Sequence, residues 1–224
     1  MKKIVSILSI LFIAFSSSFC VFAQETDQPN NKTYYIEEAG MSIDIPKNLK
    51  CVTPKTKKDD SFFKDTGSDY NETMKFLKDR QIVADFVDVK TGYEFYVTVN
   101  QTKSSIKTSD FRFMTPTQEQ KFLSQASGNK FQKELDKSVE TGVTSSKIAG
   151  FSFFDSCKFL RVNSVVPKDE KNDIATSSAL TCANKKMVGI TYSRLVKTGE
   201  GVSNEQLEVE QQALETIKFD QAIH

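Results

Sequence analysis

The fold is decided by residues 145–196, which contain four runs with the character of strands. The runs are SSKIAGFSFF (145–154), CKFLRVNSVV (157–166), ATSSALTCAN (175–184) and MVGITYSRLV (187–196). They are rich in β-branched and aromatic residues, and the polar segment PKDEKND (167–173) separates the second from the third. Strand-forming runs joined by short polar turns are typical of consecutive antiparallel strands. The stretch therefore predicts a four-stranded meander.

More strands are predicted nearer the N-terminus. Residues 41–45 (MSIDI) alternate apolar and polar side chains and end at Pro46, which is typical of a half-buried strand. Residues 82–89 and 93–101 also alternate, and the short loop Lys90–Gly92 lies between them. A glycine-containing loop between alternating runs favours a β-hairpin.

Three segments carry helix signals. Residues 71–80 have helical spacing of their apolar side chains, and TPTQ (115–118) and SNEQ (203–206) each form a capping box at the start of a helix. The resulting order is strands, helix, strands, helix. This order predicts an α+β fold, a largely antiparallel sheet with helices packed on it, in one domain that spans residues 33–220.

The first residues are typical of an export signal. Met1-Lys2-Lys3 is followed by an uncharged, largely apolar run to Ala23, with small side chains at Val21 and Ala23. This pattern predicts a signal peptide over residues 1–23, cleaved between Ala23 and Gln24. We expect an exported protein, periplasmic or extracellular, with a disordered leader over residues 24–32 and no membrane span after cleavage.

Two alternatives stay open for this segment. An uncleaved membrane anchor needs about 20 apolar residues, but the run contains several serines and a good cleavage site. Lipidation of Cys20 is the other alternative, although Phe19 stands where lipoprotein signals carry a small residue. Both are less consistent with the residues than cleavage is.

The mature chain keeps three cysteines, Cys51, Cys157 and Cys182. Export would permit a disulfide. If the second and third runs form a hairpin centred on residues 169–170, Cys157 lies opposite Cys182, within the reach of a disulfide. We therefore expect a Cys157–Cys182 bridge, with two buried thiols as the alternative. Cys51 is expected to be an unpaired, buried thiol.

Composition and charge exclude several function classes. The 30 Lys and Arg residues balance 29 Asp and Glu residues for a net charge of +1, which argues against nucleic-acid binding. The single histidine is the last residue, His224, so histidine-based triads and zinc sites have no support. Glycine-rich phosphate loops are missing from the sequence. We expect no cofactor and no metal site, although the acidic residues leave carboxylate chemistry open.

One aromatic pair is a candidate contact site. Phe62 and Phe63 lie within the charged stretch 54–68, which we expect to be an irregular loop. Exposed aromatics in such a loop can anchor a protein partner. The alternative is that both rings pack back onto the core, as phenylalanine usually does.

The order of elements resembles that of PsbP-like domains. The opening residues Tyr35 and GMSIDIPK (40–47) resemble the start of that family. Later parts also follow its order: the hairpin at 82–101, the helix after Thr115, the turn at 148–150, the hairpin at 184–186 and the closing helix before Phe219. The resemblance implies an α/β/α sandwich, shared with a nuclear import factor that binds the Ran GTPase. It implies a role in binding other proteins and carries no functional residue.

Three functional hypotheses follow, and the third is a purely structural envelope protein, which self-association in solution would distinguish. The first is an exported, non-catalytic binding or accessory module that contacts an envelope protein. The second is a small-ligand binder or a carboxylate-dependent hydrolase without histidine. A deep pocket that holds two facing carboxylates would favour the second, and a flat, filled sheet face would count against it.

Overall fold

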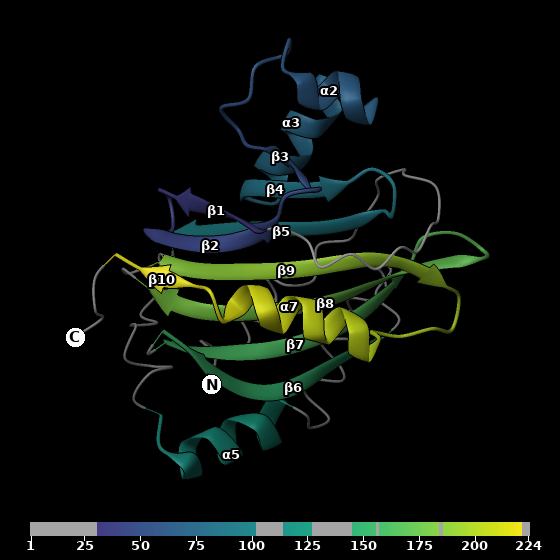
Figure 1. Ribbon diagram of the computed structural model, residues 1–224. Helices are drawn as coiled ribbons and strands as arrows, with labels where there is room; N and C mark the ends of the chain where they lie inside the picture. The colour runs from purple at the N-terminus through teal and green to yellow at the C-terminus, as the bar shows by residue number, and fades with distance from the viewer. Residues whose placement is uncertain (1–30, 102–113, 127–144, 156, 184–185, 221–224) are drawn as a thin grey trace.

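The computed structural model describes residues 31–101, 114–126, 145–155, 157–183 and 186–220 (Figure 1). The expected signal peptide and its cleavage site therefore lie outside the described residues. The first strand begins at Asn31, two residues before the expected start of the domain. Across the described ranges, no helix is long and apolar enough to cross a membrane.

The described strands form two antiparallel sheets. The larger sheet has, in spatial order, β3 (Lys50–Val52), β4 (Ile82–Asp88), β5 (Tyr93–Gln101), β9 (Lys186–Lys197), β8 (Asn172–Ala183), β7 (Cys157–Pro167) and β6 (Ser145–Phe154). The smaller sheet has β1 (Asn31–Ile36), β2 (Met41–Pro46) and β10 (Lys218–Phe219). The helices are α2 (Ser61–Thr66), α3 (Tyr70–Asp79), α5 (Pro116–Ala126) and α7 (Asn204–Leu214). The architecture is α+β with antiparallel sheets, as the sequence predicts.

The predicted meander is present as β6, β7, β8 and β9, and β9 joins it to the β4–β5 hairpin. The junction between β5 and β9 requires a glycine. A Cβ atom on Gly189 would lie 2.5 Å from Thr98 Oγ1 and 3.0 Å from a Leu180 methyl carbon. The missing side chain therefore lets Thr98 pack across the sheet at this point.

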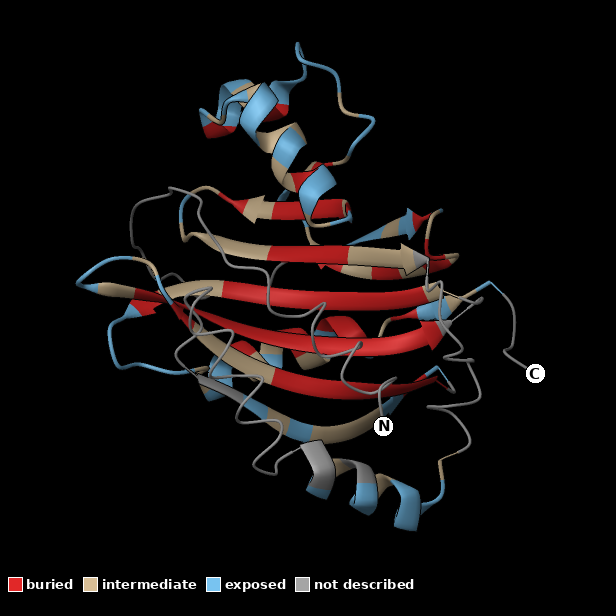
Figure 2. Cartoon of the chain, turned by 180° about the vertical axis from the view of Figure 1, so that it is seen from behind, coloured by how far each residue is buried: buried red, intermediate tan, exposed pale blue. Residues whose placement is uncertain are grey.

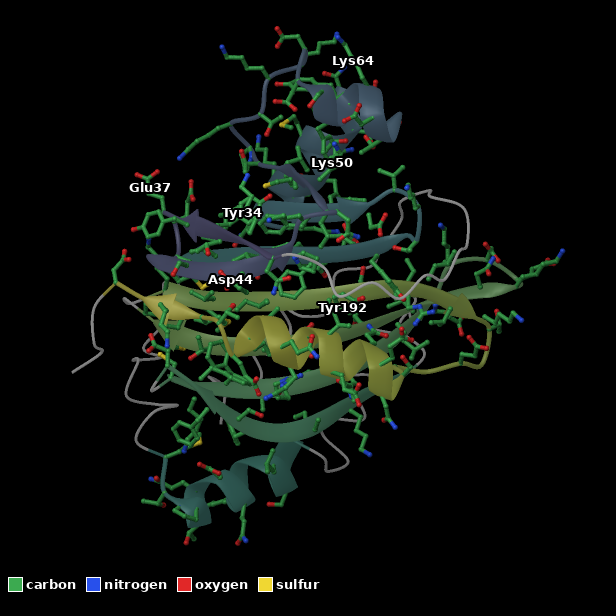
Figure 3. All side chains as sticks on the ribbon, viewed as in Figure 1. Tyr34, Glu37, Asp44, Lys50, Lys64 and Tyr192 are labelled. Atoms are coloured by element: carbon green, nitrogen blue, oxygen red, sulfur yellow. The ribbon has the colours of Figure 1, made fainter. Side chains whose placement is uncertain are left out.

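One face of the larger sheet is covered by α7 and by the smaller sheet (Figure 1). Its core includes Ile43 of β2, Phe95 of β5 and Leu214 of α7, all at most 2% exposed. Tyr192 of β9 is buried in the same cluster and is labelled in Figure 3. The N-cap of α7 is confirmed, because Ser203 Oγ accepts a hydrogen bond of 3.1 Å from the Gln206 amide. The reciprocal bond of a capping box is not formed, since the Gln206 side chain donates to the Ala175 and Tyr192 carbonyls.

The opposite face carries helices at its two ends, with the central strands between them (Figure 2). At the β4 end, α2 and α3 cover a cluster that contains Leu77, Ile82 and Tyr96. At the β6 end, α5 approaches a second cluster, and the buried Lys158 forms an ion pair with Glu119 of α5. Helices thus lie on both faces of the larger sheet.

Residues Ser61–Thr66 form the helix α2, where the sequence predicts an irregular loop. Asp60 caps its N-terminus, since Asp60 Oδ1 accepts a hydrogen bond of 2.9 Å from the Phe62 amide. Gly67 ends the helix with a φ of 70°, and its amide donates to the Phe63 carbonyl. These caps stabilise a helix of only six residues within a strongly charged stretch.

The predicted Cys157–Cys182 bridge is wrong, because the register of β7 and β8 differs by one residue from the expected one. Leu160 pairs with Leu180, so Cys182 lies opposite position 158 and not opposite Cys157. A shift of one residue moves a side chain to the other face of a sheet. Accordingly, Cys157 packs with the cluster under α7, Cys182 packs with the cluster near α5, and no disulfide joins the two.

The turn between the two strands explains the shift. The amides of Lys168 and Asp169 both donate to the Asn172 carbonyl, and the Asp169 carboxylate accepts from the Lys171 and Asn172 amides. This asymmetric turn places the centre of the hairpin at residue 170.

Cys51 of β3 is half-buried and free, and burial raises the pKa of its thiol to about 12.

Candidate functional site

A cavity of about 240 Å³ lies between α3 and the sheet face opposite α7. It is lined by apolar and acidic side chains together, chiefly Phe62, Phe76, Asp85, Glu94, Ser193 and Leu195. We call this cavity the acidic pocket. Mixed walls, mostly apolar with a few polar groups, are typical of small-ligand sites in proteins.

The helix α3 forms one wall, and its ends fix its position. Asp69 Oδ1 accepts a hydrogen bond of 2.9 Å from the Glu72 amide at the N-terminus. Leu77 is buried against Ile82 of β4. After the helix, Gln81 adopts a φ of 56°, which turns the chain sharply into β4. The wall residue Phe76 is held over the sheet by these contacts.

Two carboxylates on neighbouring strands form the polar side of the pocket. Asp85 of β4 pairs with Tyr96 of β5, and Val87 pairs with Glu94. Asp85 and Glu94 are therefore diagonal neighbours on one face, a separation that typically allows direct electrostatic interaction. Asp85 is only 4% exposed, and its Oδ1 atom has no hydrogen-bond partner among the described residues.

The electrostatics of the two carboxyl groups differ. Burial, and next the negative charge of Glu94, raise the pKa of Asp85 well above its ordinary value, against a smaller opposing effect of the Phe86 amide. Burial also raises the pKa of Glu94, but Ser193 and Arg80 oppose that rise. Ser193 Oγ donates a hydrogen bond of 2.9 Å to Glu94 Oε2. The buried carboxyl group of Asp85 is thus less well compensated by hydrogen bonds and opposite charge than that of Glu94.

Hydroxyl groups continue from the pocket across the same sheet face. Ser193 of β9 pairs with Thr176 of β8, and Thr191 pairs with Ser178. The hydroxyl oxygens of Ser178 and Thr191 lie 2.9 Å apart, and all four side chains are buried. Hydroxyl groups both donate and accept hydrogen bonds. The sheet next to the pocket is therefore polar and uncharged.

The described residues do not bring together three His, Cys, Asp or Glu side chains in an arrangement that would hold a metal ion. Within the pocket, the groups able to contact a ligand are carboxylates, hydroxyls, aromatic rings and the two cations Lys168 and Arg194. This set can accept hydrogen bonds from a ligand, can neutralise positive charge on it and can bury an apolar part of it.

The structure places Phe62 in the core, which is the second of the two interpretations of the aromatic pair. Phe62 is 4% exposed and belongs to the cluster with Leu77. Phe63 is half-buried, with ring centroids 5.2 Å from Phe62 and 5.3 Å from Tyr70. Phe62 also lines the acidic pocket, so its ring is part of a wall.

Asp85 and Glu94 were not predicted as site residues. A signal for Asp85 exists in the sequence, because it lies within the strongly apolar run IVADFVDV (82–89), where a charged residue on a covered face is unusual. Glu94 carries no such signal, since it alternates with Tyr93 and Phe95 as an outward residue of a half-buried strand would. Residues of α3 and α2 lie across the cavity from it.

The sequence matches no protein-family model, and a search of curated proteins gives no match. The fold is similar to the solution structure of the cyanobacterial PsbP protein CyanoP from Synechocystis sp. PCC 6803, with 10% identity and a TM-score of 0.42. That alignment covers 88% of this chain and 97% of the other. A crystal structure from Bacteroides thetaiotaomicron has 9% identity and a TM-score of 0.40 over 86% of this chain and 50% of that one.

A third similar structure is LpqN of Mycobacterium tuberculosis, which is described as involved in cell envelope biogenesis. It is 6% identical with a TM-score of 0.40, over 84% of this chain and 90% of the other. A PsbP protein is thus among the structures to which the fold of this chain is similar. These likenesses concern the fold alone.

Proposed function

We propose that this chain is an exported, non-catalytic binding module and that the acidic pocket is its ligand site. The observation that carries the proposal is Asp85. A buried carboxylate is costly unless hydrogen bonds and opposite charges compensate it. Asp85 Oδ1 has no such partner in the described part of the chain, and the residue lines a cavity. A ligand in that cavity would supply the missing compensation.

The composition of the pocket supports a small ligand in preference to a protein surface. Phe62, Val87 and Leu195 provide apolar walls, and Ser193 and Glu94 provide oriented polar groups. A cavity lined by two carboxylates from neighbouring strands supports the ligand-binding hypothesis over the envelope-partner hypothesis. The proposed export rests on the signal-peptide pattern of residues 1–23.

A thermal-shift screen tests the proposed function. The purified protein is melted with small amines, alcohols, sugars and carboxylic acids, beside an Asp85→Asn variant and an Asp59→Asn variant as the matched exposed control. We expect at least one compound class to raise the Tm of the wild type and of the control, but not of Asp85→Asn. Equal shifts in all three proteins, or no shift with any class, would contradict a ligand site at this pocket.

A second candidate function, a carboxylate-dependent hydrolase, is favoured by one observation. Asp85 and Glu94 share a cavity, and burial raises the pKa of Asp85, as a general acid working near neutral pH requires. Turnover of a panel of chromogenic esters and glycosides, lost in both Asp85→Asn and Glu94→Gln, would establish this candidate. Binding without turnover would leave the binding module as the function.

A further inference from the structure

We infer that the acidic pocket binds an organic ammonium ion, with the charged head at Asp85 and an apolar body along the Phe76 wall. The inference rests on the proposed function and names the class of its ligand. It is carried by three features of the site: the uncompensated carboxylate oxygen, the surplus of negative charge and the aromatic wall.

The charge of the site favours a cation. Five carboxylates line the cavity and outnumber its two cations, Lys168 and Arg194. Asp85 and Glu94 lie on neighbouring strands, and Arg80 is the cation whose charge acts on Glu94. Asp85, when ionised, has no counterion among the charges that act on it, because its charged neighbour is another acid. An ammonium group brings one positive charge and three hydrogen-bond donors, which match an acceptor that has no donor.

The apolar wall favours a cation with a hydrophobic body. Phe62, Val87 and Leu195 line the cavity beside the carboxylates. The ring of Phe76 already attracts a cation, since the guanidinium carbon of Arg80 lies 5.0 Å from its centroid. Burial of an apolar body against these walls contributes to binding in proportion to its area. A bare metal ion would leave these walls unused.

Other ligand classes fit less well. An anion would meet two carboxylates, and like charges in a cavity of low dielectric repel strongly. A neutral alcohol can donate one hydrogen bond to Asp85, but it does not neutralise the carboxylate. The cavity of about 240 Å³ is large enough for a compact aralkyl amine and too small for most drug-sized ligands.

Calorimetric titration with matched probes tests the inference. The probes are 2-phenylethylammonium chloride, the neutral 2-phenylethanol, sodium 3-phenylpropanoate and calcium chloride. We expect 2-phenylethylammonium to bind about tenfold or more tightly than 2-phenylethanol, because a charge-assisted hydrogen bond replaces a neutral one. The carboxylate and calcium probes should not bind. Asp85→Asn should weaken the ammonium ion by about tenfold and leave 2-phenylethanol nearly unchanged.

The outcomes separate this inference from the proposed function. If the alcohol, the carboxylate or calcium binds most tightly and Phe76→Leu or Asp85→Asn weakens it, the pocket is a ligand site but the ammonium class is wrong. If the ammonium ion binds Asp85→Asn and Glu94→Gln as tightly as the wild type, it binds elsewhere and the inference is wrong. If none of the probes binds and the thermal-shift screen is also negative, both are wrong. Glu94→Gln serves as the second variant should Asp85→Asn fail to fold.

Discussion

Two buried carboxylates on opposite faces of the same sheet are compensated differently. Glu210 of α7 is fully buried, forms an ion pair with Arg161 of β7 and accepts a hydrogen bond of 2.5 Å from Ser177 Oγ. Asp85 of β4 is almost as buried, but its charged neighbour is Glu94. In each carboxyl group, one oxygen has no hydrogen-bond partner among the described residues. The two carboxylates therefore differ in their charged neighbour, which is the cation Arg161 for Glu210 and another acid for Asp85.

This difference distinguishes a carboxylate that supports the fold from the carboxylate that we propose binds a ligand. Glu210 is a buried residue of α7, and its ion pair with Arg161 joins this helix to the sheet. Burial raises the pKa of Glu210 too, but Arg161 and Ser177 oppose the rise. Asp85 lies beside a cavity, and no ion pair joins it to another element among the described residues. A carboxylate kept at such a position lowers stability, which is common for residues that serve binding.

The largest effect is expected from removing the cation on the α7 face. Arg161→Met makes Glu210 resemble Asp85, and we expect a loss of about 3–5 kcal/mol in the free energy of unfolding, because a buried charge is left unpaired. Urea denaturation measures it. The double variant Arg161→Met/Glu210→Met is the control and should recover most of the loss, since well-packed apolar replacements of a buried pair are often neutral. A single variant within about 1 kcal/mol of the wild type would mean that the ion pair is not structural.

A smaller effect concerns pH and the pocket face. Asp85 ionises near pH 3.9 in the unfolded chain, and its folded pKa is raised. Its contribution to stability is therefore complete below about pH 3.9 and is lost as the pH rises through the folded pKa. We expect the stability of Asp85→Asn relative to the wild type to increase with pH over this range. Urea denaturation between pH 4 and pH 9 measures it, and a difference that falls with pH would contradict a raised pKa.

The same titration governs binding of a cation. An ammonium ion favours ionised Asp85, so the affinity for 2-phenylethylammonium should rise with pH through the folded pKa and level off above it. The other titratable or charged groups of the pocket and its surroundings are Glu94, Tyr96, Arg80, Asp69, Glu72, Asp88, Lys168 and Arg194. The matched control is Asp85→Asn, in which we expect a flatter profile. An equal slope in both proteins would assign the pH dependence to another of these groups.

The smallest effect is expected from a reducing agent. Cys157 and Cys182 belong to clusters on opposite faces of the sheet and do not form a disulfide with each other. We therefore expect the intact mass to be the same before and after reduction, and the urea midpoint to be unchanged. A mass increase of about 2 Da and a loss of about 2–4 kcal/mol on reduction would contradict the observed register.

Much of the fold follows from local patterns. Several elements are specified within a few residues. Examples are the alternation in Met41–Ile45, the hairpin loop Lys90–Gly92 and the N-cap at Ser203. The register of β7 and β8 does not follow in this way, because the Asp169 turn shifts it by one residue through hydrogen bonds that spacing alone does not reveal. One residue was enough to separate the two cysteines.

The site was less accessible from sequence than the fold. Asp85 stands out only by its apolar neighbours, and Glu94 has the pattern of an ordinary outward residue. The two meet because β4 and β5 pair in one register and α3 closes the space above them. Phe62 was singled out for its charged surroundings, but the caps at Asp60 and Gly67 fold it inward. Long-range pairing and helix placement decide such a site.

Whether Asp85 serves binding and not the fold is tested most directly by the free energy of unfolding of Asp85→Asn at pH 7. It is measured by urea denaturation beside the wild type and Asp59→Asn. If Asp85 is retained for binding and not for the fold, the variant should be more stable than the wild type by about 0.5–2 kcal/mol, as removal of an uncompensated group commonly gives. The exposed control should be unchanged. A variant less stable than the wild type would show that Asp85 supports the fold, and would contradict the account.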